Sequence, residues 1–494
     1  MPKQTTTLPL VLPPREADVP ASRWLGAALR AEILAGRVRP GARLPATRDL
    51  AKQYGLSRGT IVSAFEQLKA EGYLEGTVGS GTYVRDVLPD ELLRASRATG
   101  TRSSSARLPR RRLSALADRV KPFPEVAGGF TRPFRANQPA LELFPTELWA
   151  RLAAHRVRRA TARHLLGSRA IGYRPLRIAV TDYLTTSRGV QCTPEQVVIV
   201  SGVQEALDLV ARLFVDPGDR VCIEDPGYAG AALVFEARGA RISAVPVDAE
   251  GMEVPGARLG DARLAYLTPG HQFPLGTSMS MSRRRALLAW ARSTGAVLFE
   301  DDYDSEFRYA GRPLPALQGL DRHGVVIFAG TFSKVLFPSL RLGYLVVPPD
   351  LVDRVAAVKS ITNRHAPTLD QGVLADFISE GHFARHIRRM REVYAERRAA
   401  LLESARERLA GLVEVADRDC GLQTVGWLCC GLEAGAAADA AARRDLETIP
   451  ISRYCYQPPS RDGLLIGFAA VDAQDIRRGV LDLAAALEEA SRGG

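Results

Sequence analysis

Hydrophobic positions follow one pattern near the N-terminus and another through most of the chain. Residues 20–85 alternate apolar and polar side chains at helical spacing and then become rich in Gly and Thr. From about residue 132 to 490, short Val/Ile/Leu runs such as Gln196–Ser201 and Val325–Gly330 alternate with longer amphipathic stretches. Near-continuous apolar strands between helices are typical of a buried, mainly parallel sheet. We therefore predict a small, mostly helical domain followed by a large α/β domain.

The N-terminal pattern predicts three helices and a hairpin. Apolar residues recur on one face along 25–34, and Ser22 can cap this first helix. Gly55 can end a short second helix in a left-handed conformation. Ser57 can cap a third helix, and two short strands within residues 73–84 then flank a Gly-rich hairpin tip or wing. This order of elements is typical of a winged helix-turn-helix.

The next segment has the composition of a linker. Residues 86–128 lose the helical periodicity and gather Arg, Ser, Ala and Pro. Seven arginines fall between Arg94 and Arg112 with no acidic residue among them, so the segment repels itself. We therefore predict three regions, which are a domain at 20–85, a basic flexible linker at 86–128 and a second domain at 129–494.

Positive charge is concentrated in the first quarter of the chain. Of the net charge of +11, residues 1–128 contribute +9, from 21 lysines and arginines against 12 acidic residues. Concentrated positive charge binds phosphate backbones because it releases condensed counterions. A solvated basic surface would give the same count, so charge alone favours a nucleic-acid partner without deciding it.

Other features narrow the class of protein. No run of about 18 apolar residues predicts a membrane span, and no apolar stretch near the N-terminus predicts a secretory signal. The six cysteines show no C-x-x-C spacing, so we expect neither a metal site nor a disulfide framework. These features predict a cytoplasmic protein that does not associate with membranes.

The second domain carries motifs that match the needs of a pyridoxal 5′-phosphate site. Such a site needs a lysine for a Schiff base and a carboxylate that keeps the pyridine nitrogen protonated. It also needs backbone N–H groups and an arginine for the phosphate. Candidates for each part lie at the carboxyl ends of predicted strands, where open α/β sheets bind ligands.

Four of these candidates would contact the pyridine ring. Lys334, in Gly330-Thr-Phe-Ser-Lys334, is the candidate catalytic and Schiff-base residue. Asp301 is the candidate partner of the pyridine nitrogen, and Tyr303 of the phenolic oxygen. Tyr228, in Glu224-Asp-Pro-Gly-Tyr228, is the candidate for stacking on the ring.

The remaining candidates would hold the phosphate. Gly202, Val203 and Gln204 open a helix after a strand, so their amides can form a phosphate cup. Thr331 is the candidate phosphate hydroxyl and Arg341 the candidate phosphate-binding arginine. Each motif alone is a weak signal, but five motifs in this order between residues 201 and 344 favour a cofactor site over chance.

The N-terminal region resembles the GntR-type winged helix-turn-helix. The matching motifs are R-P-G-x-x-L-P-x-x-R-x-L-A, S-R-x-T-[IV], L-x-x-E-G-[YW]-L and G-x-G-T-x-V, found at Arg39–Ala51, Ser57–Ile61, Leu68–Leu74 and Gly79–Val84. The resemblance implies DNA contacts by Arg48, Ser57, Arg58 and Thr60, and a wing that approaches the backbone through Gly79 and Gly81. The two arginines could bind phosphates rather than read bases.

The C-terminal region resembles a fold-type-I aminotransferase. The whole arrangement resembles the MocR/GabR regulators, in which a GntR-type reader is fused to such a domain. The resemblance implies a head-to-tail, domain-swapped homodimer that binds pyridoxal phosphate and paired sites on double-stranded DNA.

Three departures from the enzymes bear on activity. Phe273-Pro-Leu-Gly replaces Asn-Pro-x-Gly, Leu166-Gly-Ser-Arg-Ala-Ile-Gly-Tyr lacks the usual Tyr and Asp-Pro, and Leu464-Leu-Ile-Gly-Phe lacks a carboxylate-clamping arginine. Arg453 or Arg461 could substitute for that arginine. The departures weaken the case for transamination more than the case for cofactor binding.

These observations support three hypotheses. The favoured one is a regulator that senses pyridoxal phosphate, or an amino compound that takes the place of Lys334, with at most weak transaminase activity. The alternative is a working pyridoxal-phosphate-dependent aminotransferase with an accessory DNA-binding domain. A constitutive DNA binder with a purely structural second domain is the third.

Overall fold

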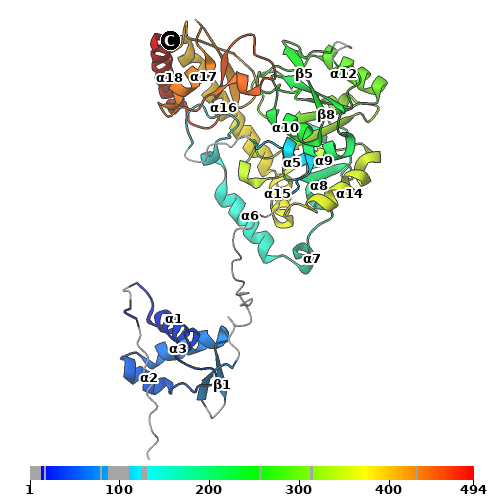
Figure 1. Ribbon diagram of the computed structural model, residues 1–494. Coiled ribbons are helices and arrows are strands. Elements are labelled where there is room, and N and C mark those ends of the chain that lie inside the picture. Colours follow the sequence, from blue (N-terminus) through cyan, green and yellow to red (C-terminus); the bar gives the residue numbers. More distant parts are fainter. Residues whose placement is uncertain are drawn as a thin grey trace, which may run out of the picture. The chain divides into compact units, whose positions relative to one another are not determined.

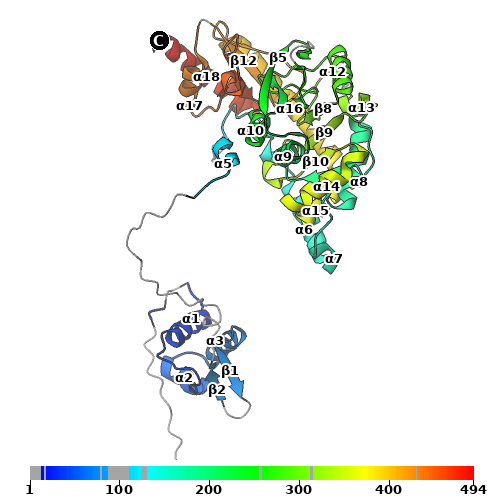
Figure 2. The same cartoon turned by 45° about the vertical axis from the view of Figure 1, so that its right-hand side comes forward.

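The computed structural model describes residues 13–15, 18–77, 81–86, 111–123, 131–254, 259–311, 315–429 and 431–493. The chain divides into two compact units, one up to Arg111 and one from Arg112 onward (Figures 1 and 2). Among the described residues, no helix combines the length and apolar character needed to cross a membrane.

The first unit consists of three helices and a hairpin. Its elements are α1 (Ala21–Leu34), α2 (Thr47–Tyr54), α3 (Arg58–Ala70), β1 (Leu74–Thr77) and β2 (Gly81–Val84). The two strands pair antiparallel, as the sequence predicted. Apolar side chains from all three helices share one core, which includes Leu25, Leu29, Leu50, Phe65 and Leu68.

The helix ends follow local chemistry, with one correction. Gly55 ends α2 with φ 62°, and the Ser57 side chain accepts the backbone N–H of Thr60 at 3.1 Å, so both predicted caps are confirmed. The prediction that Ser22 caps α1 is wrong, because α1 begins at Ala21 and Pro20 precedes it. The fixed φ of proline suits the entry to a helix, so the chain becomes helical two residues earlier.

The second unit is built on an eight-stranded sheet in the order β3-β10-β9-β8-β7-β4-β5-β6. The strands are β3 (Val197–Val200), β4 (Arg220–Asp225), β5 (Arg241–Asp248), β6 (Gly251–Met252), β7 (Leu264–Leu267), β8 (Val297–Asp302), β9 (Val326–Thr331) and β10 (Gly343–Val346). Strands β5, β4, β7, β8 and β9 are parallel, whereas β10 runs antiparallel to both of its neighbours. The predicted mainly parallel α/β fold is therefore confirmed.

Helices cover both faces of this sheet (Figures 1 and 2). The described helices of this unit before residue 380 are α5 (Ala115–Arg119), α6 (Thr146–Arg158), α7 (Ala162–Leu165), α8 (Arg174–Ser187), α9 (Val203–Phe214), α10 (Ala229–Arg238), α12 (Met281–Thr294), α13 (Leu317–Leu320), α14 (Val352–Thr362) and α15 (Thr368–Ser379). Short 3₁₀ turns occur at η1 (Leu141–Leu143), η2 (Pro338–Leu340) and η3 (Pro349–Leu351). Consecutive residues of β3 belong to different hydrophobic clusters. Val198 packs with α9 and α10, whereas Ile199 packs with α8 and α15. This alternation is the two-sided burial that the apolar strands predicted.

A smaller antiparallel sheet completes the second unit. It contains β11 (Val413–Val415), β12 (Gln423–Leu428), β13 (Ile449–Pro450) and β14 (Gly463–Gly467). It is accompanied by α16 (His382–Arg408), α17 (Ala434–Ala442), η4 (Ile451–Tyr454) and α18 (Ala473–Gly493).

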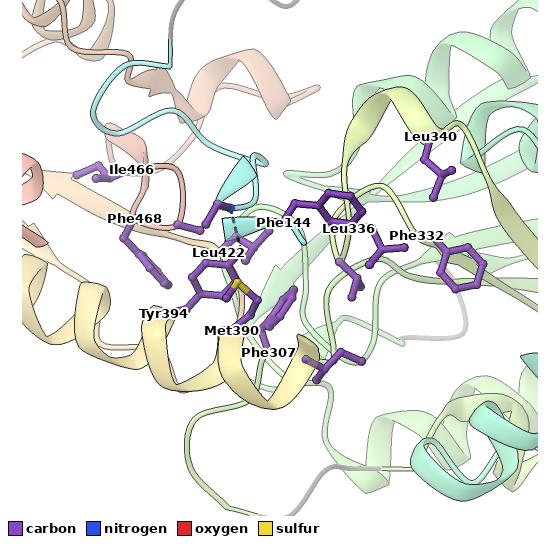
Figure 3. Packing of buried hydrophobic residues seen from close by; sticks show 14 of the residues in the cluster. Phe144, Phe307, Phe332, Leu336, Leu340, Met390, Tyr394, Leu422, Ile466 and Phe468 are labelled. Carbon is purple, nitrogen blue, oxygen red and sulfur yellow. Dashed lines mark hydrogen bonds between the residues drawn. The ribbon is translucent and has the colours of Figure 1, made fainter. Parts of the chain in front are cut away.

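One continuous core joins the two sheets of this unit. Figure 3 shows Met390 and Tyr394 of α16 beside Phe307, which follows the large sheet, and Leu422 and Phe468, which border the small one. The ring centroids of Phe307 and Tyr394 are 4.9 Å apart, and the Tyr394 hydroxyl accepts the Ala140 N–H at 2.9 Å. Residues next to both sheets therefore pack in one shared core.

Candidate functional site

The register of the large sheet brings the predicted cofactor residues to one edge. Strands β8 and β9 are parallel, and Asp301 pairs with Ala329, so their carboxyl ends lie side by side. Strand β10 runs the other way, and its first residue Gly343 pairs with both Thr331 and Val200. The loops that carry Asp301, Lys334, Arg341 and Gly202 therefore meet at the same edge.

The N-terminus of α9 forms a cup beside Arg341. Gly202 precedes this helix with φ 115°, and a Cβ atom there would lie 3.4 Å from Nη1 of Arg341. Val203 and Gln204 are the first helical residues, whose N–H groups have no acceptor within the helix. Arg341 itself has a left-handed φ of 50°. Free amides and a guanidinium at a helix N-terminus suit a phosphate group.

A buried ion pair fixes the loop that forms this cup. The Ser201 N–H donates to Oε2 of Glu205 at 2.5 Å, and Oε1 of Glu205 accepts from the buried Lys359. Lys359 also donates to Oδ1 of Asn363 at 3.0 Å. No local motif indicates a role for Lys359, because its partner lies 154 residues away along the chain.

Thr331 and Lys334 lie in the turn that follows β9. The Thr331 hydroxyl accepts the N–H of Ser333 at 3.1 Å, which holds the turn. Nζ of Lys334 donates to the Asn137 backbone carbonyl at 2.8 Å. Burial lowers the pKa of Lys334 to about 8, although the carboxylates of Asp304 and Asp301 act in the opposite direction. A larger fraction of this lysine is therefore the neutral amine, which is the form that attacks an aldehyde.

Asp301 is a buried carboxylate with one oxygen in use. Its Oδ2 accepts the Tyr266 hydroxyl at 2.8 Å, and its buried Oδ1 has no hydrogen-bond partner among the described residues. Burial raises the pKa of Asp301 to about 7, while the Tyr266 hydrogen bond opposes the rise. Buried polar atoms are almost always paired in native proteins. A protonated pyridine nitrogen would supply the donor that Oδ1 lacks.

Tyr228 links the predicted ring-stacking position to the phosphate cup. It is the N-cap residue of α10, and its hydroxyl accepts Nε2 of Gln204 at 2.9 Å. Its ring lies 6.3 Å from that of Tyr266 and 6.1 Å from that of Phe273, between centroids. Burial raises the pKa of Tyr228 to about 12, so the ring stays neutral.

Tyr303 lies in a polar network that the sequence did not predict. Its hydroxyl is 3.1 Å from Nδ1 of His271, and that nitrogen is 2.8 Å from Oδ1 of Asp304. The Tyr303 ring meets the Phe273 ring edge-on at 5.9 Å. Burial raises the pKa of Tyr303 well above its usual value. His271 is close in sequence to Phe273, and Asp304 is next to Tyr303, but only the fold pairs them.

The positions of Arg453 and Arg461 do not identify either residue as a substitute for the missing carboxylate-clamping arginine. Arg461 donates to Glu414 at 2.7 Å, and its guanidinium lies 5.7 Å from the ring of Trp427. The Arg461 side chain is therefore bound to residues of the small sheet. Arg453 lies in η4, with an exposed side chain.

The first unit gathers most of the predicted DNA-contacting residues on α2 and α3. Arg48 is exposed on α2, and Ser57 and Arg58 are exposed at the start of α3. The Thr60 hydroxyl is 2.8 Å from that of Ser57, so these two side chains also stabilise the helix end.

The predicted wing is described only in part. Gly81 begins β2 with φ 124°, a backbone conformation that favours glycine, and a Cβ atom there would lie 2.8 Å from Nε of Arg43. Gly79 lies outside the described residues.

Comparisons with known proteins match both units. The family of bacterial regulatory proteins named gntR matches residues 22–84, and aminotransferase class I and II matches residues 136–423. The protein MocR of Rhizobium meliloti is 41% identical over 473 residues, which cover 96% of this chain and 94% of that protein. The pyridoxine biosynthesis transcriptional regulator PdxR of Corynebacterium glutamicum is 32% identical over 475 residues, which cover 95% and 96%.

The second unit also resembles solved aminotransferases. The α-aminoadipate aminotransferase LysN of Thermus thermophilus aligns with a TM-score of 0.69 and 29% identity, covering 77% of this chain and 98% of that one. The kynurenine aminotransferase of Pyrococcus horikoshii aligns with a TM-score of 0.67 and 27% identity, covering 73% and 91%. The chain therefore belongs to the MocR-type transcriptional regulators, in which a GntR-type helix-turn-helix is joined to an aminotransferase class I domain.

Proposed function

We propose that this regulator binds pyridoxal phosphate at Lys334 and changes its affinity for operator DNA in response to that cofactor or to an amino compound. The observation that carries the proposal is the free Oδ1 of buried Asp301 at the same sheet edge as an amine with a lowered pKa. The cup at Gly202 and Arg341 lies at this edge as well. Together they offer a partner for each polar part of a phosphorylated pyridine aldehyde. When bound, the cofactor would supply an aldehyde that captures amines.

Each residue has a defined part in this proposal. The amides of Gly202, Val203 and Gln204 would hold the phosphate, together with Thr331 and Arg341. Asp301 would keep the proton on the pyridine nitrogen, Tyr228 would cover one face of the ring, and Tyr303 would donate to the phenolic oxygen.

The DNA-binding part of the proposal rests on the first unit. Arg48, Ser57, Arg58 and Thr60 would contact DNA, with α3 as the recognition helix. Gly79 and Gly81 would let the wing approach the backbone. We keep 20–85, 86–128 and 129–494 as functional regions, and a head-to-tail, domain-swapped homodimer as the assembly that reads paired DNA sites.

Sensing is favoured over catalysis by two observations. Phe273 stands where the enzymes have an asparagine, and its ring packs on Tyr228 and Tyr303 in place of a polar contact. The name of PdxR also connects a relative, aligned over 96% of its length, to pyridoxine biosynthesis. A ligand can shift a regulator between two states only by binding one of them more tightly.

The proposal is tested on the full chain and on the Lys334→Ala variant. DNA fragments selected by the protein from a random pool serve as operators, and affinity is measured with and without pyridoxal phosphate. The proposal requires a visible absorption band in the unaltered protein and a cofactor-dependent change in affinity that Lys334→Ala abolishes. Equal affinities in every state would refute sensing, and multiple turnover of an amino donor and a keto acid would establish the aminotransferase alternative.

A further inference from the structure

His271 lies in a closed environment beside the ring-binding part of the site. It is 4% exposed, its ring stacks on that of Tyr303 at 5.7 Å, and its Nδ1 contacts both Asp304 and Tyr303. A Cβ atom at Gly421 would come within 2.0 Å of its Cε1, and one at Gly276 within 3.1 Å of its Nε2. The two glycines therefore let the backbone approach the ring closely and restrict its movement.

The hydrogen on Nδ1 determines what Tyr303 can do. Asp304 is 1% exposed and, as a carboxylate, can only accept, so at 2.8 Å the hydrogen lies on Nδ1 of His271. A nitrogen that carries this hydrogen has no lone pair left for the Tyr303 hydroxyl. The hydroxyl must therefore direct its own hydrogen to another acceptor, and its oxygen remains beside the imidazole.

The charges around His271 are consistent with this arrangement. Burial opposes a charged imidazole, but Asp304 and Cys420 outweigh it and raise the pKa of His271 well above its usual value. Asp301 and Glu224 also act on Tyr303, and both favour its neutral hydroxyl over a phenolate. The carboxylates of Asp304 and Asp301 also act on Lys334, where they favour the charged amine.

We propose that His271, held by Asp304, is a positioning residue that orients the Tyr303 hydroxyl as a donor toward the phenolic oxygen of the cofactor. The inference rests on the proposed function. It also explains how the site does without the asparagine that Phe273 replaces, since one oriented hydroxyl takes over its contact. His271 does not itself contact the cofactor in this proposal.

The test is a pH titration of the visible band of the lysine-bound cofactor. A donor to the phenolic oxygen stabilises its deprotonated form, so losing the donor moves the titration midpoint upward. Tyr303→Phe removes the donor and should raise the midpoint by about one unit. Asp304→Asn should give a similar rise, because Nδ1 of the neutral imidazole then has a lone pair that can accept the Tyr303 hydrogen, while the net charge of the pair does not change.

Two further variants separate positioning from structure. The double variant His271→Asn with Asp304→Asn keeps a donor near the place of Nδ1 and leaves the net charge of the pair unchanged, so its midpoint should stay close to that of the unaltered protein. His271→Ala should shift the midpoint as Tyr303→Phe does, and it replaces Asp304→Asn if that variant does not fold. Circular dichroism and cofactor stoichiometry are measured for each variant.

The outcomes are distinct. If the titration midpoint shifts in Tyr303→Phe but not in Asp304→Asn or His271→Ala, the positioning role is overturned. The cofactor proposal is then unaffected. An unshifted Tyr303→Phe would overturn it as well, since the hydroxyl would then not contact the phenolic oxygen. Absence of any visible band from the unaltered protein would overturn both proposals.

Discussion

The ring of Phe123 lies against the ring of Tyr228, with centroids 6.4 Å apart and planes inclined by 57°. Phe123 belongs to the segment that enters the second unit, and α5 just before it lies on α10. Arg119 donates to the Ala237 carbonyl at 3.2 Å, and Nζ of Lys121 is 3.2 Å from Oε2 of Glu236. The last part of the region that we assigned to the linker therefore contacts the candidate stacking residue of the cofactor site.

This contact predicts that Phe123→Ala weakens communication between cofactor and DNA. An aromatic pair contributes about 0.5–1.5 kcal/mol beyond area burial, so the cofactor-dependent change in operator affinity should shrink by about two- to tenfold. Operator titrations with and without pyridoxal phosphate measure this change. Leu113→Ala, on the same segment and 68% exposed, is the control that should behave as the unaltered protein. Equal effects of the two variants would show that the ring contact carries no coupling.

The lowered pKa of Lys334 predicts how fast the cofactor-free protein captures pyridoxal phosphate at different pH values. Only the neutral amine reacts, so the rate should rise about tenfold per unit below pH 8 and level off above it. Stopped-flow absorbance measures the rate. A lysine with its ordinary pKa would instead give a rate that keeps rising to about pH 10.

The exposed position of Arg58 at the start of α3 predicts a DNA contact. Arg58→Ala should weaken operator binding by about 1–3 kcal/mol if it reads a base, or lower the salt slope by about one if it binds a phosphate. Cofactor absorbance should not change. Arg23→Ala removes the same charge from an exposed position on α1 and is the matched control. Unchanged operator binding and salt slope in Arg58→Ala would contradict the assignment of α3.

The backbone at Gly81 predicts a local loss of stability on substitution. Gly81→Ala would force a residue with a Cβ atom to adopt φ 124°, which should destabilise the first unit by about 1–3 kcal/mol. Hydrogen exchange of peptides from residues 20–85 measures the effect in the full chain. Gly26→Ala is the control, since this residue lies within α1 and an added Cβ would be 3.7 Å from the nearest atom of Gln67. Equal exchange in the two variants would exclude the backbone explanation.

Local patterns in the sequence were enough to predict the fold class and the edge of the sheet where the candidate cofactor residues lie. Apolar runs with polar residues at their ends predicted that Asp301, Lys334 and Gly202 lie at one edge of the sheet, because parallel strands share a carboxyl edge. The strand pairing places them there. The caps at Gly55 and Ser57 were predictable because they depend on neighbouring residues alone.

The contacts that tune the site were not predictable. Tyr266, His271 and Asp304 gain their roles from partners on other strands and loops, and such pairs leave no periodic trace. The packing of α5 and Phe123 on α10 is similar, since a short helix in a basic, Ser-rich segment carries a weak local signal. The error at Ser22 was smaller, because the helix starts only two residues earlier, directly after Pro20.

The most direct test of the account compares operator affinity of the full chain in its cofactor-free and pyridoxal-phosphate-loaded forms, with Lys334→Ala measured in parallel. The account predicts that the cofactor changes affinity in the unaltered protein by about 5- to 150-fold, the usual range of allosteric coupling, and leaves Lys334→Ala unaffected. A Lys334→Ala variant that responds to the cofactor as the unaltered protein does would contradict it.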